Sequence, residues 1–454
     1  MKSPQSRQVR ALADALVAAD WRIDDLVARA TRAVGRKTPP RWLVGVASRL
    51  LQHFWRARPR PEAVVAWLDA DHGFDRARAR GSVRLSPAIQ EPPALVPALG
   101  PPGTWSVPAI CTVPALAAWL EVDPARLDWW ADRRGLERAA PDGPLRRYDY
   151  RWRPKRDGSS RLIEVPRPGL KACQRRLLAG LISLIPPHPA VHGFRPGRSV
   201  GTFVAPHVGQ AVVLKLDLRD FFPGVTAARV AAIFRTAGYP EEVARTLAGL
   251  CTNVAPAAAW HRPDAPARTS TDYHRTRQVY RARHLPQGAP TSPSLANLAA
   301  CRLDARLAGL ARSAGASYTR YADDLAFSGD ARWGRSVDRF AVHVAAIVRE
   351  EGFAVHPRKT RVMRAGVRQV LAGAVVNVRP NVPRDDFDAL KATLHNCLGR
   401  GPAGQNRAAV ADFPSHLRGR IAHVATLNPA RGAKLRALFD RIDWADAGQA
   451  NQTR

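Results

Sequence analysis

The sequence has 454 residues, of which 46% are hydrophobic and 24% are charged, and these proportions are typical of a globular protein with a sizeable buried core. Lysine and arginine number 70 against 38 acidic residues, and the resulting net charge of +32 indicates a polyanionic partner such as nucleic acid. The five scattered cysteines exclude a disulfide scaffold, and no apolar run is long enough to cross a membrane, so we expect a cytoplasmic protein without membrane partners.

The chain is predicted to begin with a helical extension over residues 1–81. Apolar residues such as Leu12 and Leu16 recur at helical spacing, and another helix is expected to begin after Pro40. Residues 82–108 are rich in proline, alanine and glycine, a composition typical of a linker. We therefore place a domain boundary in this segment.

Residues 109–380 mix helical and strand patterns and are predicted to form the main domain. Two short helices separated by Pro124 are expected first. Two alternating stretches then flank the Asp157-Gly158 pair, which predicts a β-hairpin with a tight turn. Residues 381–454 return to helical spacing and are predicted to form a helical C-terminal region.

Three aspartates are the candidate catalytic residues. Asp323 and Asp324 are adjacent and lie between short β-prone runs, which predicts a hairpin with both carboxylates at its tip. An apolar strand pattern earlier in the chain ends at Asp217. Each feature alone also fits an ordinary turn or strand end. Together they predict carboxylates that bind two metal ions for phosphoryl transfer, because clustered anions require a cation between them.

These segments resemble two motifs of reverse transcriptases, an aspartate that ends a strand and the Tyr-Ala-Asp-Asp sequence, and the loop Leu285–Gly288 resembles a third. The resemblance implies an α+β right-hand polymerase fold, with fingers, a palm built on an antiparallel sheet, and a helical thumb after the helical N-terminal extension. It also implies that Asp217, Asp323 and Asp324 are catalytic and that Lys359 donates a proton to the leaving pyrophosphate.

The resemblance further implies the ligands of the site. Two Mg²⁺ ions, with Mn²⁺ as an alternative, are expected to bind the three aspartates and the backbone carbonyl of Leu218. The bulky ring of Phe222 implies deoxynucleotide substrates, because it would exclude a 2′-hydroxyl. Arg156 is a further candidate for phosphate contact. The residues expected to bind the incoming deoxynucleoside triphosphate (dNTP) are Lys155, Arg161, Phe222, Gln287 and Gly288.

Segments 191–200, 368–377 and 416–429 are most similar to bacterial retron reverse transcriptases. The similarity implies a partner non-coding RNA as template and primer, a branched RNA-linked single-stranded DNA product (msDNA), a role in defence against phage, and an effector protein as a further partner. Two segments depart from the retron pattern: 203–207 keeps only its histidine, and 371–373 reads Leu-Ala-Gly instead of Val-Thr-Gly. The residues expected to bind RNA are His207, Arg418 and Arg420.

Two other functions fit the same motifs. A non-retron prokaryotic reverse transcriptase, of the abortive-infection or group II intron class, would share them, although group II intron enzymes usually carry a further C-terminal domain. A non-catalytic RNA-binding protein with a polymerase fold is the second alternative. Loss of metal ligands would be expected in such a protein, whereas all three aspartates are present here.

Overall fold

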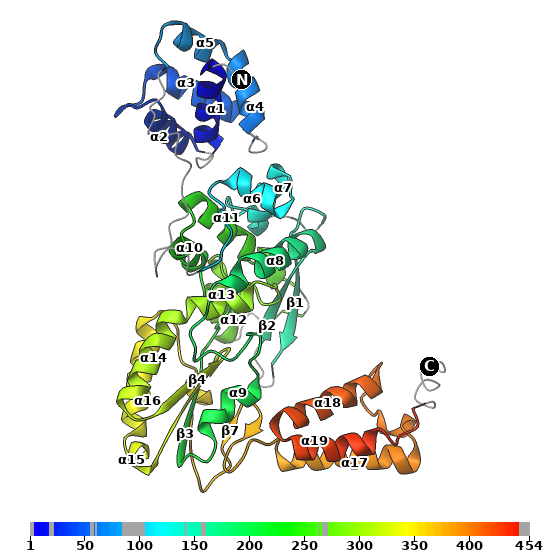
Figure 1. Ribbon diagram of the computed structural model, residues 1–454. Helices are drawn as coiled ribbons and strands as arrows, with labels where there is room; N and C mark the ends of the chain where they lie inside the picture. Colours follow the sequence, from blue (N-terminus) through cyan, green and yellow to red (C-terminus); the bar gives the residue numbers. More distant parts are fainter. Residues whose placement is uncertain are drawn as a thin grey trace. The chain divides into compact units, whose positions relative to one another are not determined.

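The computed structural model describes residues 4–17, 22–54, 59, 61–83, 105–139, 141, 143–155, 160–262, 264–265 and 271–444 (Figure 1). The chain divides into unit 1, residues 1–186 and 222–299, and unit 2, residues 187–221 and 300–454. The units are thus interleaved along the chain, and the boundaries of the four consecutive segments predicted from the sequence remain predictions. Most of the predicted linker, the Asp157-Gly158 turn and Arg156 lie outside the described residues.

The N-terminal part of unit 1 is helical and has a hydrophobic core of its own. Leu12, Leu16, Leu43 and Leu50 are fully buried in this core, which confirms the helical spacing. A helix begins directly after Pro40, as predicted, because the proline ring fixes an extended entry to the first turn. The described helices of this part are α1 (Pro4–Val17), α2 (Ile23–Ala33), α3 (Arg41–His53), α4 (Pro61–Ala70) and α5 (His72–Ala79).

The remainder of unit 1 combines helices with an antiparallel hairpin of two strands, β1 (Tyr148–Pro154) and β2 (Ser160–Pro166). Alternate residues of β1, from Tyr148 to Trp152, are buried, so the other face of the strand is exposed. The other elements are α6 (Val113–Leu120), α7 (Pro124–Ala131), η2 (Leu136–Arg138), α8 (Pro168–Gly180), η3 (Ile182–Leu184), α10 (Ala227–Thr236), α11 (Glu241–Cys251), η5 (Ala257–Trp260), α12 (Thr271–Arg281) and α13 (Ser292–Ala299).

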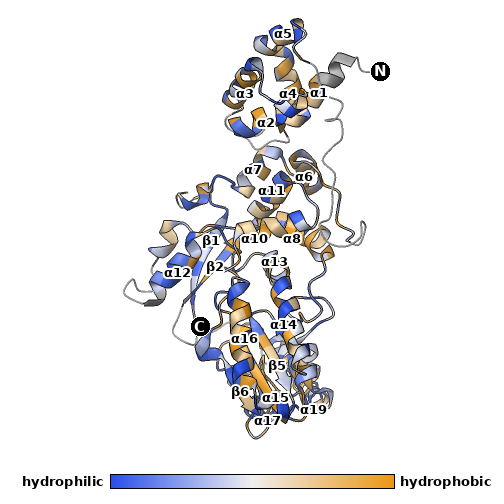
Figure 2. Cartoon of the chain, turned by 90° about the vertical axis from the view of Figure 1, so that its left-hand side faces the viewer, coloured by the Kyte–Doolittle hydropathy of each residue, from blue (hydrophilic) through white to orange (hydrophobic). Residues whose placement is uncertain are grey.

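Unit 2 contains an antiparallel sheet whose strands follow one another in space as β4 (Ser317–Tyr321), β5 (Asp324–Gly329), β3 (Val212–Asp217) and β6 (Arg361–Arg364). Helices α14 (Cys301–Ser313) and α16 (Val337–Glu350) lie along one face of this sheet (Figure 1), and the strands carry hydrophobic residues (Figure 2). The sheet and helices together agree with the predicted α+β class. The short helices of this part are α9 (Val200–Val204), η4 (Ala205–His207), α15 (Ala331–Gly334) and η6 (Pro357–Lys359).

The C-terminal part of unit 2 is mainly helical, as predicted. Leu390 and Leu394 lie on one face of the first helix and are buried in a core that also contains Leu417 and Leu435. In the part of the chain that the structure describes, no helix is long and apolar enough to span a bilayer. The elements are β7 (Val370–Leu371), β8 (Ala374–Val375), α17 (Arg384–Arg400), η7 (Ala403–Gln405), α18 (Phe413–Leu427) and α19 (Pro429–Phe439).

Candidate active site

The end of β3 meets the tip of the β4–β5 hairpin within unit 2. The antiparallel register places Asp217 opposite Asp324. Next to this pair, the backbone amide of Leu218 donates a hydrogen bond to the carbonyl of Asp323 over 2.8 Å. The structure therefore brings together the two segments in which the sequence predicted catalytic carboxylates.

Two lysines face the carboxylates. The Nζ atom of Lys359 lies 3.1 Å from an oxygen of Asp217, and that of Lys215 lies 3.0 Å from an oxygen of Asp324. Burial, together with repulsion from Asp217 and Asp324, raises the pKa of Asp323. Burial also raises the pKa of Asp324, although the charge of Lys215 opposes it. The two lysines thus leave part of the negative charge at the site uncompensated.

A buried ion pair that the sequence did not predict holds the tip of the hairpin. Arg320 in β4 is fully buried and donates two hydrogen bonds of 2.7 Å to the carboxylate of Asp304 in α14. Its remaining terminal nitrogen donates to the carbonyl of Ala322 over 2.9 Å. Ala322 has a φ of 54°, which is unfavourable for a residue with a side chain. Arg320 therefore stabilises the strained turn that immediately precedes Asp323.

The exposed face of the β1–β2 hairpin in unit 1 is lined by arginines. Arg161, a predicted triphosphate ligand, lies directly opposite Arg153, and both are exposed. Arg151 is exposed on the same face, while the predicted ligand Lys155 is half-buried at the end of β1. Like charges placed opposite one another are unfavourable, so an anion is a fitting ligand here. The alternation Arg-Trp-Arg could have identified Arg151 and Arg153 from the sequence.

The predicted nucleotide-contacting loop packs against β2. The carbonyl of Gln287 accepts a hydrogen bond from the amide of Glu164 over 2.8 Å. Gly288 has a φ of 129°, and a Cβ atom at this position would lie 2.8 Å from the Glu164 carbonyl oxygen. Only glycine fits this close approach. Phe222 is half-buried, whereas Phe221 is buried against Phe353.

Comparison with known proteins shows the family. The family model described as "Reverse transcriptase (RNA-dependent DNA polymerase)" matches residues 153–392. The chain is 35% identical over 395 residues to the Retron Mx162 reverse transcriptase of Myxococcus xanthus, an alignment covering 83% of this chain and 71% of that protein. This chain belongs to the retron reverse transcriptases.

Other retron reverse transcriptases are similar over shorter stretches. The Retron Mx65 reverse transcriptase of Myxococcus xanthus is 44% identical over 288 residues, or 62% of this chain and 62% of that protein. The Retron Ec86 reverse transcriptase of Escherichia coli is 29% identical over 284 residues, or 62% of this chain and 77% of that protein. The chain thus spans less than two thirds of the Mx65 relative.

Reverse transcriptases as a family use divalent metal ions, and the donor chemistry of this site fits such ions. Carboxylate and carbonyl oxygens are the ligands that Mg²⁺ prefers, and the raised pKa of Asp323 reflects negative charge that a cation would offset. Within the described residues, however, no three acidic, histidine or cysteine side chains are grouped closely enough to hold a metal ion. Asp217 and Asp324 are instead paired with lysines. Metal binding would therefore require these two ion pairs to open.

The structure does not support the predicted RNA contact of His207 in this retron reverse transcriptase. Its side chain is fully buried, and its ring nitrogens lie 2.7 Å from the hydroxyl of Thr319 and 2.7 Å from that of Ser328. Burial lowers the pKa of His207 to about 4, so the ring is neutral at physiological pH. With both nitrogens satisfied inside the core, His207 connects η4 to β4 and β5 instead of binding RNA.

The other two predicted RNA ligands lie in α18 but face different surroundings. The guanidinium of Arg418 lies 5.6 Å from the centre of the Phe439 ring, which indicates a packing role. Arg420 lines an open cavity of about 550 Å³ together with His416 and His423. Arg418 is exposed and Arg420 is half-buried, so contact with a nucleic acid stays a prediction for both arginines.

Proposed function

We propose that this chain is an RNA-directed DNA polymerase of retron type, which copies a partner non-coding RNA into single-stranded DNA. The observation that carries the proposal is the meeting of Asp217, at the end of β3, with Asp323 and Asp324 at the tip of the β4–β5 hairpin, in a member of the retron reverse transcriptases. The product is expected to be branched and RNA-linked, and the system is expected to act in phage defence with an effector protein.

The reaction is attack by a primer hydroxyl on the α-phosphate of a dNTP, with departure of pyrophosphate. Two bound Mg²⁺ ions would lower the pKa of the attacking hydroxyl and neutralise charge on the triphosphate. Asp217 and Asp323 would supply the principal oxygen ligands of these ions, and Asp324 and the Leu218 carbonyl would be further ligands. Lys359, which lies 3.1 Å from Asp217, would protonate the departing pyrophosphate once that ion pair opens.

Unit 1 supplies the residues that select the nucleotide in this proposal. Arg161, supported by Arg151 and Arg153 on the same exposed face, binds the triphosphate through charge-assisted hydrogen bonds. Lys155 adds a further positive charge at the end of the strand. Phe222 excludes a 2′-hydroxyl, and the Gln287-Gly288 backbone contacts the nucleotide at a point where a side chain would not fit.

The test is to express the full chain from its native locus and purify it. The nucleic acid that copurifies is then treated with RNase, DNase and a debranching enzyme and analysed. A discrete DNA that shortens with RNase and changes on debranching is expected, together with Mg²⁺-dependent synthesis on a primed RNA template. The Asp323→Asn variant serves as control and should yield no DNA. Synthesis without a branched product would contradict the expected retron-type, RNA-linked product. The absence of any synthesis would contradict the polymerase function.

The defence role is tested separately in cells. Bacteria that carry the complete locus with the wild-type chain are expected to survive phage challenge better than bacteria with the Asp323→Asn variant. Equal survival of the two strains would show that any protection does not depend on DNA synthesis.

A further inference from the structure

A buried histidine–glutamate pair lies behind the loop Leu285–Gly288 in unit 1. The His284 side chain is fully buried, with its Nε2 atom 2.9 Å from a carboxylate oxygen of Glu164 in β2. Its Nδ1 atom lies 2.8 Å from the backbone carbonyl oxygen of Ala282. A carbonyl and a carboxylate both accept hydrogen bonds, so both ring nitrogens must donate. This arrangement makes His284 a buried imidazolium paired with a carboxylate.

The surroundings of His284 favour this charged form. Burial lowers its pKa, but the charge of Glu164 and the hydrogen bond to it more than offset burial, so the pKa lies above the ordinary value. The adjacent Arg283 opposes the positive charge only weakly. The ring of Tyr280 lies edge-on at 4.7 Å, and Asn253 donates to the second carboxylate oxygen of Glu164 over 2.8 Å.

The contrast with His207 supports the assignment. Both histidines are fully buried, but the partners of His207 are hydroxyl groups, which can donate as well as accept. A neutral ring satisfies that environment, and the pKa of His207 falls to about 4. Burial alone therefore does not determine the charge of a histidine in this protein, because the acceptor carboxylate of Glu164 is what distinguishes His284.

The pair is tied to the nucleotide-contacting loop through the backbone at both partners. Glu164 donates its amide hydrogen to Gln287, and its carbonyl oxygen lies against Gly288. His284 immediately precedes the loop, and its backbone exchanges two hydrogen bonds of 2.9 Å with Asn253. A change in the separation of the two side chains would thus displace Gln287 and Gly288 relative to β2.

We propose that the His284–Glu164 ion pair positions the loop Leu285–Gly288 for the incoming dNTP and thereby sets the KM for dNTP. The inference rests on the proposed polymerase function and assigns to both residues a positioning role, since neither is placed against the substrate. The pair is present at pH values below the raised pKa of His284 and is lost as the pH rises through it. The KM of the wild-type enzyme should therefore rise at alkaline pH.

The test compares Glu164→Gln with a matched buried glutamate. Glutamine preserves the shape and the hydrogen bond from Asn253 but removes the charge that holds the proton on His284. We expect the KM for dNTP to rise about tenfold, which is the change in an equilibrium constant that corresponds to about one pKa unit of lost interaction between His284 and Glu164. The kcat should stay within about twofold of wild type. The alkaline rise of KM should disappear in this variant, because His284 would already be neutral.

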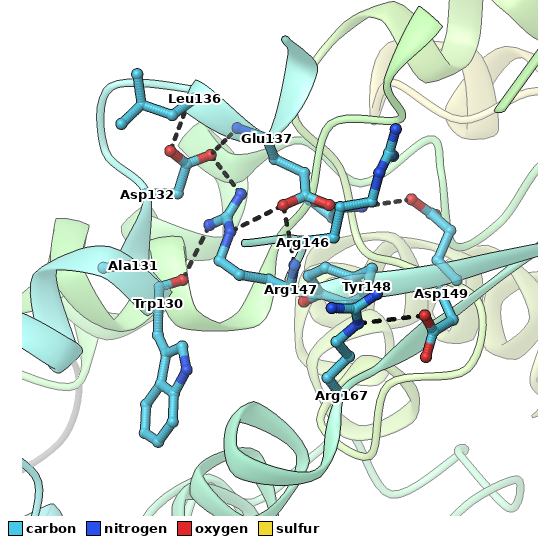
Figure 3. Close-up of polar contacts among 12 residues, drawn as sticks. Trp130, Ala131, Asp132, Leu136, Glu137, Arg146, Arg147, Tyr148, Asp149 and Arg167 are labelled. Atoms are coloured by element: carbon cyan, nitrogen blue, oxygen red, sulfur yellow. Dashed lines mark hydrogen bonds and ion pairs between the residues drawn. The ribbon is translucent and has the colours of Figure 1, made fainter. Parts of the chain in front are cut away.

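Glu137→Gln is the control. Glu137 belongs to the same buried network and accepts hydrogen bonds from Arg147 and from Tyr150 over 2.9 Å. Among the residues that the structure describes, it makes no hydrogen bond with the loop, and Figure 3 shows it beside Arg147 and Asp132. This variant should unfold at a lower temperature while its KM for dNTP and its pH profile stay unchanged. Such a difference separates positioning from a general loss of stability.

The inference is overturned if folded Glu164→Gln has the wild-type KM. A wild-type KM that stays flat as the pH rises from the ordinary pKa of histidine, about 6.5, to the alkaline limit of the folded enzyme would overturn it as well, and this measurement remains decisive if Glu164→Gln does not fold. If either of these results is found and the wild-type chain makes DNA, only the proposed positioning role is contradicted. If the wild-type chain makes no DNA, the proposed polymerase function is contradicted, and the positioning role, which rests on it, is contradicted as well.

Discussion

At the scale of single residues, the carboxylate of Asp323, which is predicted to be catalytic, is unfavourable for the stability of the folded chain. Its raised pKa means that the ionised form is disfavoured in the folded chain, because burial and two neighbouring carboxylates oppose it. We therefore expect Asp323→Asn to abolish DNA synthesis while the midpoint of thermal unfolding stays equal or rises. Primer extension with Mg²⁺ and a thermal melt measure the two effects. Wild-type synthesis by this variant would contradict the catalytic assignment.

His207 and Arg420 should show opposite effects. His207→Ala removes the partner of the buried Ser328 hydroxyl, whereas the Thr319 hydroxyl still donates to the carbonyl of Phe203, and the loss costs about 1–3 kcal/mol of unfolding free energy. The RNA affinity of the folded variant should be unchanged. Arg420 lines an open cavity, and Arg420→Ala should weaken RNA binding with little effect on stability. Denaturant unfolding and RNA titration measure both, and loss of RNA affinity in stable His207→Ala would restore the original prediction.

At the scale of elements, the buried ion pair of Arg320 with Asp304 anchors the β4–β5 hairpin to α14. Asp304→Ala would leave the Arg320 guanidinium buried without its carboxylate, and such a loss costs about 3–5 kcal/mol. The double variant Arg320→Met, Asp304→Leu should recover much of this stability, because both charges are gone. It should still be impaired in synthesis, since Ala322 loses the donor that fixes the catalytic turn. Full activity of the stable double variant would contradict this role.

Local patterns in the sequence predicted the elements that depend on neighbouring residues. The helical faces around Leu12 and Leu390, and the pairing of strands β1 and β2, follow from spacing alone. The strand period could also have identified Lys215, which lies on the same face of β3 as Asp217 and pairs with Asp324.

Contacts between distant residues were beyond such patterns. Arg320 reads as an ordinary polar residue of a strand, and only the packing of α14 beneath it supplies Asp304. Glu164 and His284 are 120 positions apart, and no periodicity links them. His207 was predicted to bind RNA because a histidine occupies a family position, but a sequence does not reveal that its ring is enclosed by β4 and β5.

At the scale of the whole molecule, the chain enters unit 1, passes to unit 2 and returns to unit 1 before it finishes in unit 2. The predicted catalytic carboxylates belong to unit 2, whereas the predicted triphosphate ligands Lys155 and Arg161 belong to unit 1. The two sets of residues are therefore predicted to affect different kinetic constants. Variants of the arginine face of β1 and β2 should raise the KM for dNTP, whereas aspartate variants should abolish turnover.

The N-terminal helices are the part of the molecule that the proposed chemistry does not use. They have a hydrophobic core of their own, and their surface exposes Arg32, Arg36, Lys37 and Arg41 at the connection between α2 and α3. In a chain with a net charge of +32, this surface is suited to RNA phosphates. We expect removal of residues 1–83 to weaken binding of the partner RNA and to reduce its salt dependence, because fewer counterions are released.

Synthesis on a short pre-annealed template should survive this deletion, since the aspartates and the loop Leu285–Gly288 are retained. The Arg36→Ala, Lys37→Ala variant is the finer control, because it removes two charges and leaves the helical core in place. Its RNA affinity should fall between those of the wild-type and truncated chains. The slope of log affinity against log salt concentration should be less steep than that of the wild type, by an amount equivalent to about one to two phosphate contacts. If both variants bind RNA as the wild-type chain does at every salt concentration, the positively charged residues that bind the RNA must lie elsewhere in the chain. The N-terminal helices would then be candidates for contact with a protein partner.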